Sequence, residues 1–260
     1  MILLSAFVAA LFLLPRPGWI TLSIFVLALG AWEWGRLAQL PAAGRVLYSL
    51  AVTAFTVWFV VAPEAAALKT LFYGTAAIFW LVFAPLWLWE RAAFATPAVP
   101  LATGLIALVP ACLSMIDIRE SRPSLMLGVL ALVWISDSAA YFAGIFRGRR
   151  KLAPDISPGK TREGLYGALA AVTVYAIGWM FVAGGPEPDV LRRAALGPMW
   201  FVLVLLGLAL AGVTGDLLES QMKRQAGVKD SGGLLPGHGG ILDRIDALLP
   251  VLPLAALFFL

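Results

Sequence analysis

Nine apolar runs, separated by short polar segments, constrain the fold of this chain more than any other feature. Most of them reach the roughly 17–25 residues that an α-helix needs to cross a bilayer. The first run is short and leads into Pro15-Arg-Pro-Gly18, where we expect the helix to turn. The pattern predicts an all-α, polytopic membrane protein of about nine transmembrane helices. The runs cover residues 2–14, 19–38, 46–62, 70–89, 98–116, 124–146, 164–183, 198–221 and 245–260.

Composition supports a membrane setting and excludes an ordinary soluble domain. Apolar residues make up 61% of the chain and charged residues 13%, whereas soluble domains carry about 25% charged residues. We expect one integral membrane domain over residues 1–260, with its catalytic part at about 130–250. The single cysteine, Cys112, lies in an apolar run. It excludes a disulfide within the chain and a cysteine-based metal site, and we interpret it as a packed, inert thiol.

The distribution of lysine and arginine predicts the orientation. If the N-terminus is cytoplasmic and nine spans alternate, 13 basic residues fall inside and 6 outside, as the positive-inside rule requires. The polar loops after the sixth and eighth spans then both face the cytoplasm, where nucleotides are available. The net charge of +4 needs no nucleic-acid partner, because these loops also face an anionic leaflet.

The segment from Ser220 to Asp246 carries the most informative chemistry. It holds two lysines, two arginines, three aspartates, the only histidine and a glycine-rich turn, between two strongly apolar runs. Basic side chains neutralise phosphate, carboxylates bind Mg²⁺, and glycines let backbone N–H groups approach an anion. Helix packing in a membrane gives no reason for this composition. The segment therefore predicts a phosphate-binding site.

Spacing predicts which of these side chains lie together. Asp216, Ser220 and Lys223 are separated by four and three residues, so a helix that continues from the eighth span places them on one face. Asp243 and Asp246 are three residues apart at the start of the ninth span. Two helix ends can thus bring three carboxylates together as a metal site. A carboxylate inside a span, as at Asp216, is costly and indicates function.

Structural alternatives exist for each of these carboxylates. Asp216 can form an ion pair with Lys223 or Arg224. Asp243 and Asp246 can complement the positive N-terminal end of a helix.

A second polar cluster follows the sixth span. Asp137 lies in that span, with Tyr141 one turn further on, and the basic run 147–151 follows. That run can serve topology alone. In Ser157-Pro-Gly-Lys160-Thr-Arg-Glu163 the small residues bend the chain, and we expect Lys160, Thr161 and Glu163 to cap the next span. Glu33, between Trp32 and Trp34, is interpreted as part of an anchor at the membrane interface.

The residue types indicate phosphoryl or nucleotidyl transfer. Three carboxylates, several cations and no activated nucleophile suit chemistry that depends on positioning and charge neutralisation. His238 lies in Pro-Gly-His-Gly-Gly without an acid at triad spacing, so it either contacts phosphate or is a turn residue satisfied by backbone. A Walker A loop is absent from the sequence.

The two polar clusters resemble the signature of the phosphatidate cytidylyltransferase family, the CDP-diacylglycerol synthases. The pattern Asp-x-x-Ala-Tyr-x-x-Gly matches at Asp137 to Gly144, and Ser-Pro-x-Lys-Thr-x-Glu-Gly matches at Ser157 to Gly164, although Gly159 stands where the family often has a basic residue. The long match is residues 220–246. The resemblance covers roughly residues 137–246, and the earlier spans match only in being hydrophobic, apart from a weaker similarity at Glu33 in Trp32-Glu-Trp34.

This resemblance implies the reaction of CTP with phosphatidate to give CDP-diacylglycerol and pyrophosphate for phospholipid synthesis, with Mg²⁺ as cofactor. It implies an enzyme of the cell (inner) membrane whose site faces the cytoplasm, and it leaves a homodimer open. The implied metal ligands are Asp216, Asp243 and Asp246, which with Lys223 form the implied catalytic set. The implied substrate-binding residues are Ser220, Arg224, Lys229, Asp230, His238, Asp137, Ser157, Lys160 and Glu163.

Two functions of other kinds remain as alternatives. A CTP-dependent polyprenol kinase uses similar metal and phosphate chemistry, but needs a base for its alcohol and transfers the γ-phosphate. An ion-coupled transporter also places carboxylates such as Asp137 and Asp216 inside the membrane. A transporter predicts inverted repeats rather than a cationic, glycine-rich loop.

Overall fold

The computed structural model is almost entirely helical and describes residues 2–62, 66–93, 96, 98–181, 198–233 and 239–260. In chain order its elements are α1 (Ile2–Leu13), α2 (Arg16–Leu37), α3 (Ala42–Val61), α4 (Ala66–Ile78), the π-helix η2 (Phe79–Phe83), α5 (Ala84–Glu90), α6 (Ala98–Ser121), α7 (Pro123–Arg147), β1 (Lys151–Ala153), β2 (Ser157–Thr161), α8 (Arg162–Trp179), α10 (Pro198–Gln225), α11 (Leu242–Ile245) and α12 (Leu248–Phe259).

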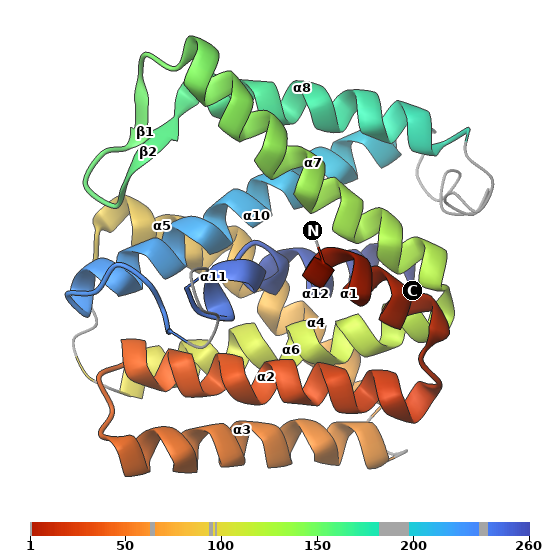
Figure 1. The fold of residues 1–260 in the computed structure, drawn as a ribbon, viewed down its shortest axis with the longest axis vertical. Helices are drawn as coiled ribbons and strands as arrows, with labels where there is room; N and C mark the ends of the chain where they lie inside the picture. The colour runs from red at the N-terminus through yellow and green to blue at the C-terminus, as the bar shows by residue number, and fades with distance from the viewer. Residues whose placement is uncertain (1, 63–65, 94–95, 97, 182–197, 234–238) are drawn as a thin grey trace.

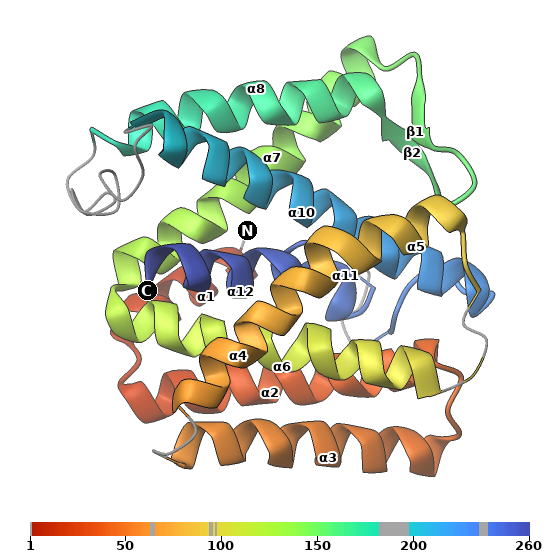
Figure 2. The same ribbon diagram turned by 180° about the vertical axis from the view of Figure 1, so that it is seen from behind.

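The helices form a bundle built around α6. Helix α6 packs against α2, α4 and α12. It is the most buried of the six long apolar helices, because 72% of the residues in its most apolar stretch are buried inside the protein. Helices α2 and α3 lie side by side at one edge of the bundle (Figure 1). Helices α7 and α8 form an antiparallel pair at the opposite edge, and α10 crosses between that pair and the centre, as the view from behind also shows (Figure 2).

Six helices among the described residues are long and apolar enough to cross a membrane. They are Arg16–Leu37, Ala42–Val61, Leu68–Glu90, Ala98–Ser121, Pro123–Arg147 and Pro198–Gln225. The third of these runs through α4, η2 and α5 without a break. The other three predicted spans correspond to α1, α8 and the α11–α12 region, in which α12 has only 12 residues. The helical class is confirmed, six of the described helices could span a membrane, and the count of nine spans stays a prediction.

A short β-hairpin departs from the all-helical prediction. Strands β1 and β2 pair antiparallel, with Lys151 opposite Thr161 and Ala153 opposite Ser157. Helix α8 follows directly, and Thr161 is its N-cap because the hydroxyl accepts a hydrogen bond from the Gly164 N–H at 3.1 Å. This capping role of Thr161 agrees with the sequence prediction. The pairing of the two strands therefore fixes the path of residues 151–161 as the chain leaves α7.

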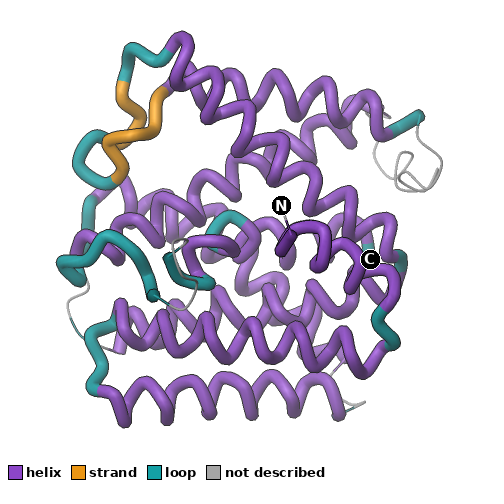
Figure 3. The backbone as a smooth tube through the Cα atoms, viewed as in Figure 1, coloured by secondary structure: helices purple, strands orange, loops and turns teal. Residues whose placement is uncertain are grey.

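Both predicted polar loops lie at the same end of the bundle. The hairpin after α7 and the described residues 226–233 and 239–241 between α10 and α11 are non-helical and lie at that end (Figure 3). The short turn between α2 and α3 also lies there, whereas the link between α6 and α7 lies at the opposite end (Figure 1). We call the first end the hairpin end. The arrangement places the two polar clusters beside one another in space.

Three buried hydroxyls are satisfied within their own helices, as suits a chain in a bilayer. The hydroxyls of Ser23, Thr56 and Ser114 each donate to a carbonyl one turn earlier in their own helix.

Helices α7 and α8 approach so closely that a Cβ at Gly128 would overlap the Trp179 ring. Cys112 is buried in the core and free, which confirms the packed thiol.

Candidate active site

Helix α10 presents the first part of the site. The Ser220 hydroxyl lies 3.4 Å from Asp216 Oδ1, so the predicted shared face of these two residues is confirmed. The other oxygen of Asp216, Oδ2, lies 2.6 Å from Lys160 Nζ. The ion pair of Asp216 is therefore made with the β-hairpin, and the alternative partners considered from the sequence, Lys223 and Arg224, bind elsewhere.

Lys160 gathers carboxylates from three elements. It comes from β2, and its side chain is 24% exposed. Besides the contact with Asp216, it interacts electrostatically with Asp137 of α7 and with Asp246. Asp137 and Asp246 each interact with Asp216 as well. The structure thus brings together Asp137, Lys160, Asp216 and Asp246, which the sequence placed in two separate clusters.

Glu219 belongs to the same site, although sequence reasoning missed it. It is 2% exposed, and its Oε2 lies 2.5 Å from Lys223 Nζ. Its other oxygen, Oε1, is buried without a hydrogen-bond partner, and the carboxylate interacts electrostatically with Asp246. The signal was present in the sequence: Glu219 follows Asp216 by three residues in an apolar span, which puts both on one helix face.

Lys223 is enclosed by carboxylates. Its ammonium lies 2.6 Å from Asp243 Oδ1 in addition to its contact with Glu219, and its side chain is 13% exposed. The second oxygen of Asp243 accepts hydrogen bonds from the Ser231 N–H at 3.0 Å and from the Gly240 N–H at 2.8 Å. The Asp243 carboxylate is thus held by the Lys223 ammonium and by two backbone N–H groups. Lys223 therefore ties α10 to α11.

The three predicted metal ligands do not converge as one group. Among the described residues, no set of three or more His, Cys, Asp or Glu side chains has the geometry to hold a metal ion. Asp243 binds Lys223 and the loop, whereas Asp246 interacts with Asp216 and Glu219. The buried, unpartnered Oε1 of Glu219 beside two further carboxylates provides the hard oxygen atoms that Mg²⁺ prefers. The donor chemistry of Asp216, Glu219 and Asp246 suits a divalent cation, but their side chains as placed here do not form a ligand set.

Other predicted site residues hold the hairpin end together. Arg224 Nε donates to the Ile156 carbonyl at 3.3 Å and so joins α10 to the turn of the hairpin. Glu163 accepts the backbone N–H groups of Arg149 and Arg150, at 3.0 and 3.1 Å, and these bonds lower its pKa. Glu163 was predicted to cap the next span; its side chain instead binds the chain just before the hairpin, and the N-cap of α8 is Thr161.

The remaining predicted contacts are at the rim. Ser157 lies in β2 opposite Ala153. Lys229 and Asp230 are exposed in the turn after α10. His238 lies outside the described residues, so its assignment stays a prediction.

Glu33 corrects an interpretation made from sequence. The flanking tryptophans indicated an anchor at the membrane interface, but Glu33 is 1% exposed. Its carboxylate accepts the Leu242 N–H at 2.8 Å, across 209 positions of the chain. Trp34 is buried as well, and its Nε1 donates to the Pro100 carbonyl at 2.6 Å. These side chains therefore pack inside the protein.

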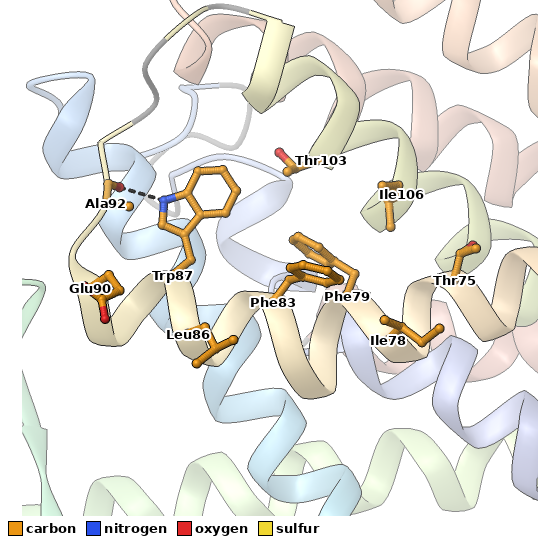
Figure 4. A pocket seen from close by; sticks show the side chains of 10 residues that line it. All are labelled: Thr75, Ile78, Phe79, Phe83, Leu86, Trp87, Glu90, Ala92, Thr103 and Ile106. Carbon is orange, nitrogen blue, oxygen red and sulfur yellow. Dashed lines mark hydrogen bonds between the residues drawn. The ribbon is translucent and has the colours of Figure 1, made fainter.

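An apolar pocket of about 580 Å³ lies on the other side of α10 (Figure 4). It is lined by residues of α4, η2, α5 and α6, and Trp87 Nε1 donates to the Ala92 carbonyl at 2.7 Å across one end. Gln221 and Gln225 also donate to that carbonyl, at 3.1 and 3.0 Å. Gln221 and Gln225 follow Asp216 by five and nine residues, so around the axis of α10 they lie about 140° and 180° away from Asp216. The pocket is thus separate from the acidic site.

These features, a helical membrane-type bundle with basic and acidic side chains gathered at one end, agree with the comparisons with known proteins. The chain belongs to the cytidylyltransferase family, whose family model matches residues 1–260.

Within that family the chain is similar to bacterial phosphatidate cytidylyltransferases. It is 37% identical over 249 residues to the protein of that name from Pseudomonas aeruginosa, which covers 89% of this chain and 83% of the relative. The Haemophilus influenzae protein is 32% identical over 298 residues, covering 99% and 95%. A shorter match to the Bacillus subtilis protein is 46% identical over 129 residues and covers 50% of this chain.

Proposed function

We propose that this protein transfers the cytidylyl group of CTP to phosphatidate, giving CDP-diacylglycerol and pyrophosphate for phospholipid synthesis. The observation that carries the proposal is the match over nearly the full length of two proteins named phosphatidate cytidylyltransferase. The site supports it, because Lys160, Asp216 and Asp246 meet at the hairpin end of a bundle of membrane-type helices. Such a site suits a lipid headgroup that reacts with a soluble nucleotide.

The reaction needs no nucleophile from the protein. A phosphate oxygen of phosphatidate attacks the α-phosphorus of CTP, the bond from that phosphorus to the bridging oxygen breaks, and pyrophosphate leaves. A magnesium ion held by Asp216, Glu219 and Asp246 would supply positive charge against the phosphate oxygens. Lys160 faces the same carboxylates and is the cation best placed to contact a phosphate. The exposed Lys229 is proposed to meet the pyrophosphate part of CTP.

Asp243 takes a different part in this proposal from the one expected. The sequence predicted a metal ligand, but its oxygens bind Lys223, Ser231 and Gly240. We therefore propose that Asp243 holds the loop and α11 in place, and that Glu219 takes its position among the ligands. Lys223 likewise serves to position the two carboxylates that it bridges.

The lipid is proposed to reach the site from the side of α7. Asp137 lies within a membrane-type helix and is nevertheless exposed, and Tyr141, one turn further on, is 65% exposed. An exposed carboxylate in a span needs a polar partner, and it faces Asp216 and Lys160. The acyl chains would then lie along the exposed apolar side chains of α7, such as Phe142.

The membrane arrangement is part of the proposal. We propose nine membrane-embedded segments in the inner membrane, with the hairpin end in the cytoplasm, in a monomer or a homodimer. The bias of 13 basic residues against 6 and the position of both polar loops at one end of the bundle support this orientation.

One assay tests the function. Membranes that contain the protein are incubated with labelled CTP, phosphatidate and Mg²⁺, and the products are separated. We expect labelled CDP-diacylglycerol together with pyrophosphate, and loss of both in Asp216→Asn. Formation of CDP with a phosphorylated lipid alcohol would indicate a kinase instead. Absence of any CTP turnover, in membranes where the protein is present and folded, would refute the proposal.

A further inference from the structure

Glu33 is a buried carboxylate that the proposed reaction does not use. It comes from α2, and every described hydrogen bond of its carboxylate is with the distant segment 231–242. Its Oε1 accepts the Ile241 N–H at 3.0 Å, and its Oε2 accepts the Leu242 N–H at 2.8 Å and the Ser231 hydroxyl at 3.0 Å. Burying an unpaired carboxylate is very costly. These three donors therefore account for its place in the core.

The loop is shaped around this carboxylate. A Cβ added at Gly232 or at Gly240 would overlap the carboxylate oxygens of Glu33, whereas a Cβ at Gly233 would meet none of the described residues within 4 Å. Arg36, one turn further along α2, adds a bond from Nη1 to the Ser231 carbonyl at 3.3 Å. Close approach to the Glu33 carboxylate of α2 thus explains two glycines of the glycine-rich loop without a bound phosphate.

The Ser231 hydroxyl links Glu33 to the acidic site. Its oxygen lies 3.0 Å from Glu33 Oε2 and 2.9 Å from Asp243 Oδ2. Asp243 in turn binds Lys223, which binds Glu219. A continuous set of polar contacts therefore runs from α2 through the loop to α10.

We propose that Glu33 is a positioning residue of the active site. It fixes Ser231, Ile241 and Leu242 against α2 and thereby sets where Asp243 and Asp246 lie relative to α10. Its described hydrogen bonds are with the loop and the start of α11, whereas α2 packs on α3 and α6 through largely apolar faces. Loss of the carboxylate should therefore loosen the loop while the bundle stays intact. In the test below, the measurement of the KM for CTP rests on the proposed function, whereas the measurement of hydrogen exchange does not.

The first test replaces Glu33 by glutamine in the full-length protein in detergent. Glutamine keeps the volume of the side chain, but it replaces one acceptor oxygen by an N–H₂ group, which cannot accept a hydrogen bond from the backbone N–H groups of the loop. We expect faster hydrogen exchange in peptides that span 231–247, with exchange in α3 and α6 unchanged. We also expect the KM for CTP to rise about 10- to 100-fold, which corresponds to the loss of one hydrogen bond to a charged group in holding the loop. Glu33→Asp should recover part of this loss. The control is Ser23→Ala in the same helix, because the Ser23 hydroxyl bonds only to the Trp19 carbonyl of α2 in this structure.

A second pair of variants tests the same contact from the loop. Gly232→Ala should raise the KM for CTP and speed exchange as Glu33→Gln does, whereas Gly233→Ala should behave as the wild type. This pair keeps the proposal testable if Glu33→Gln does not fold.

Three outcomes would overturn the positioning role. They are wild-type exchange and KM in Glu33→Gln, equal behaviour of Gly232→Ala and Gly233→Ala, and a loss of folded protein with unchanged KM in the part that folds. If the wild type does not turn over CTP, the proposed function fails, and faster loop exchange in Glu33→Gln would still support the anchoring of the loop.

Discussion

Replacement of Lys223 by glutamine distinguishes a structural lysine from a phosphate-binding one. The sequence predicted a contact with CTP, whereas the structure places the ammonium 2.5 Å from Glu219 and 2.6 Å from Asp243. The side chains of Lys223, Glu219 and Asp243 are 13%, 1% and 13% exposed. Glutamine would leave two buried carboxylates without their cation, one of which has a further oxygen already unpartnered.

The size of the effect follows from this burial. Breaking a buried ion pair by removing one partner costs about 3–5 kcal/mol. For a protein of this size, about 1 kcal/mol corresponds to roughly 2–4 °C in Tm. We therefore expect the Tm of substrate-free Lys223→Gln to fall by about 6–20 °C. In the double variant with Glu219→Gln the loss should be smaller than the sum of the single losses, by about 1–3 kcal/mol, because the two residues touch.

The assay is thermal unfolding of purified protein in detergent, without CTP or lipid. Lys229→Gln is the matched control, since Lys229 is exposed in the following turn, and its Tm should stay within about 2 °C of the wild type. A substrate-free Tm of Lys223→Gln that is equal to the control, together with a raised KM for CTP, would refute the structural reasoning. The lysine would then be the phosphate ligand that the sequence predicted.

Three further predictions concern the metal, the acid group and the orientation. Chelation of divalent cations should abolish activity, and added Mg²⁺ should restore it; activity that persists in excess chelator would remove the metal from the proposal. Asp216→Asn and Asp246→Asn should each lower kcat by about 10²–10³-fold, as loss of one charge-stabilising group does, and should raise the Mg²⁺ concentration that activity requires. A variant with near-wild-type rates at ordinary Mg²⁺ would exclude its residue as a ligand. Cysteines placed singly at Arg149 and Gln225 should react with a membrane-impermeant reagent only from the cytoplasmic side, and labelling of either in intact cells would reverse the orientation.

The helical fold was predictable because it depends on local chemistry. A backbone in hydrocarbon has to satisfy its own hydrogen bonds, so each long apolar run becomes a helix. The nine predicted runs correspond to described helices, and Leu68–Glu90 is continuous through its π-helix. The hairpin at 151–161 was missed because its strands are only three and five residues long and show no apolar alternation. Contacts between distant segments accompany it, since Glu163 accepts the backbone N–H groups of Arg149 and Arg150 just before the first strand.

The site was predictable only where its members share one helix. The spacing of Asp216 and Ser220 predicted their common face, and their contact confirms it. The same rule applied to Glu219 would have added the carboxylate that sequence reasoning omitted. Spacing could not give the partners of Asp243 and Asp246, because α11 is only four residues long and the two side chains contact different groups.

Contacts between distant segments decide what each charged residue does, and helical periodicity carries no information about them. Lys160 looked like a cap for α8, and its contact with Asp216 follows only from the way the hairpin folds toward α10. Glu33 looked like an interfacial residue because its neighbours in sequence are tryptophans, yet its partners are Ser231 and Leu242. In a membrane protein the burial of a carboxylate is decided by whether other segments supply enough donors. The charge of Glu33 is therefore understood only together with the loop that surrounds it, and the same reasoning makes the glycines of that loop part of the fold as well as of the site.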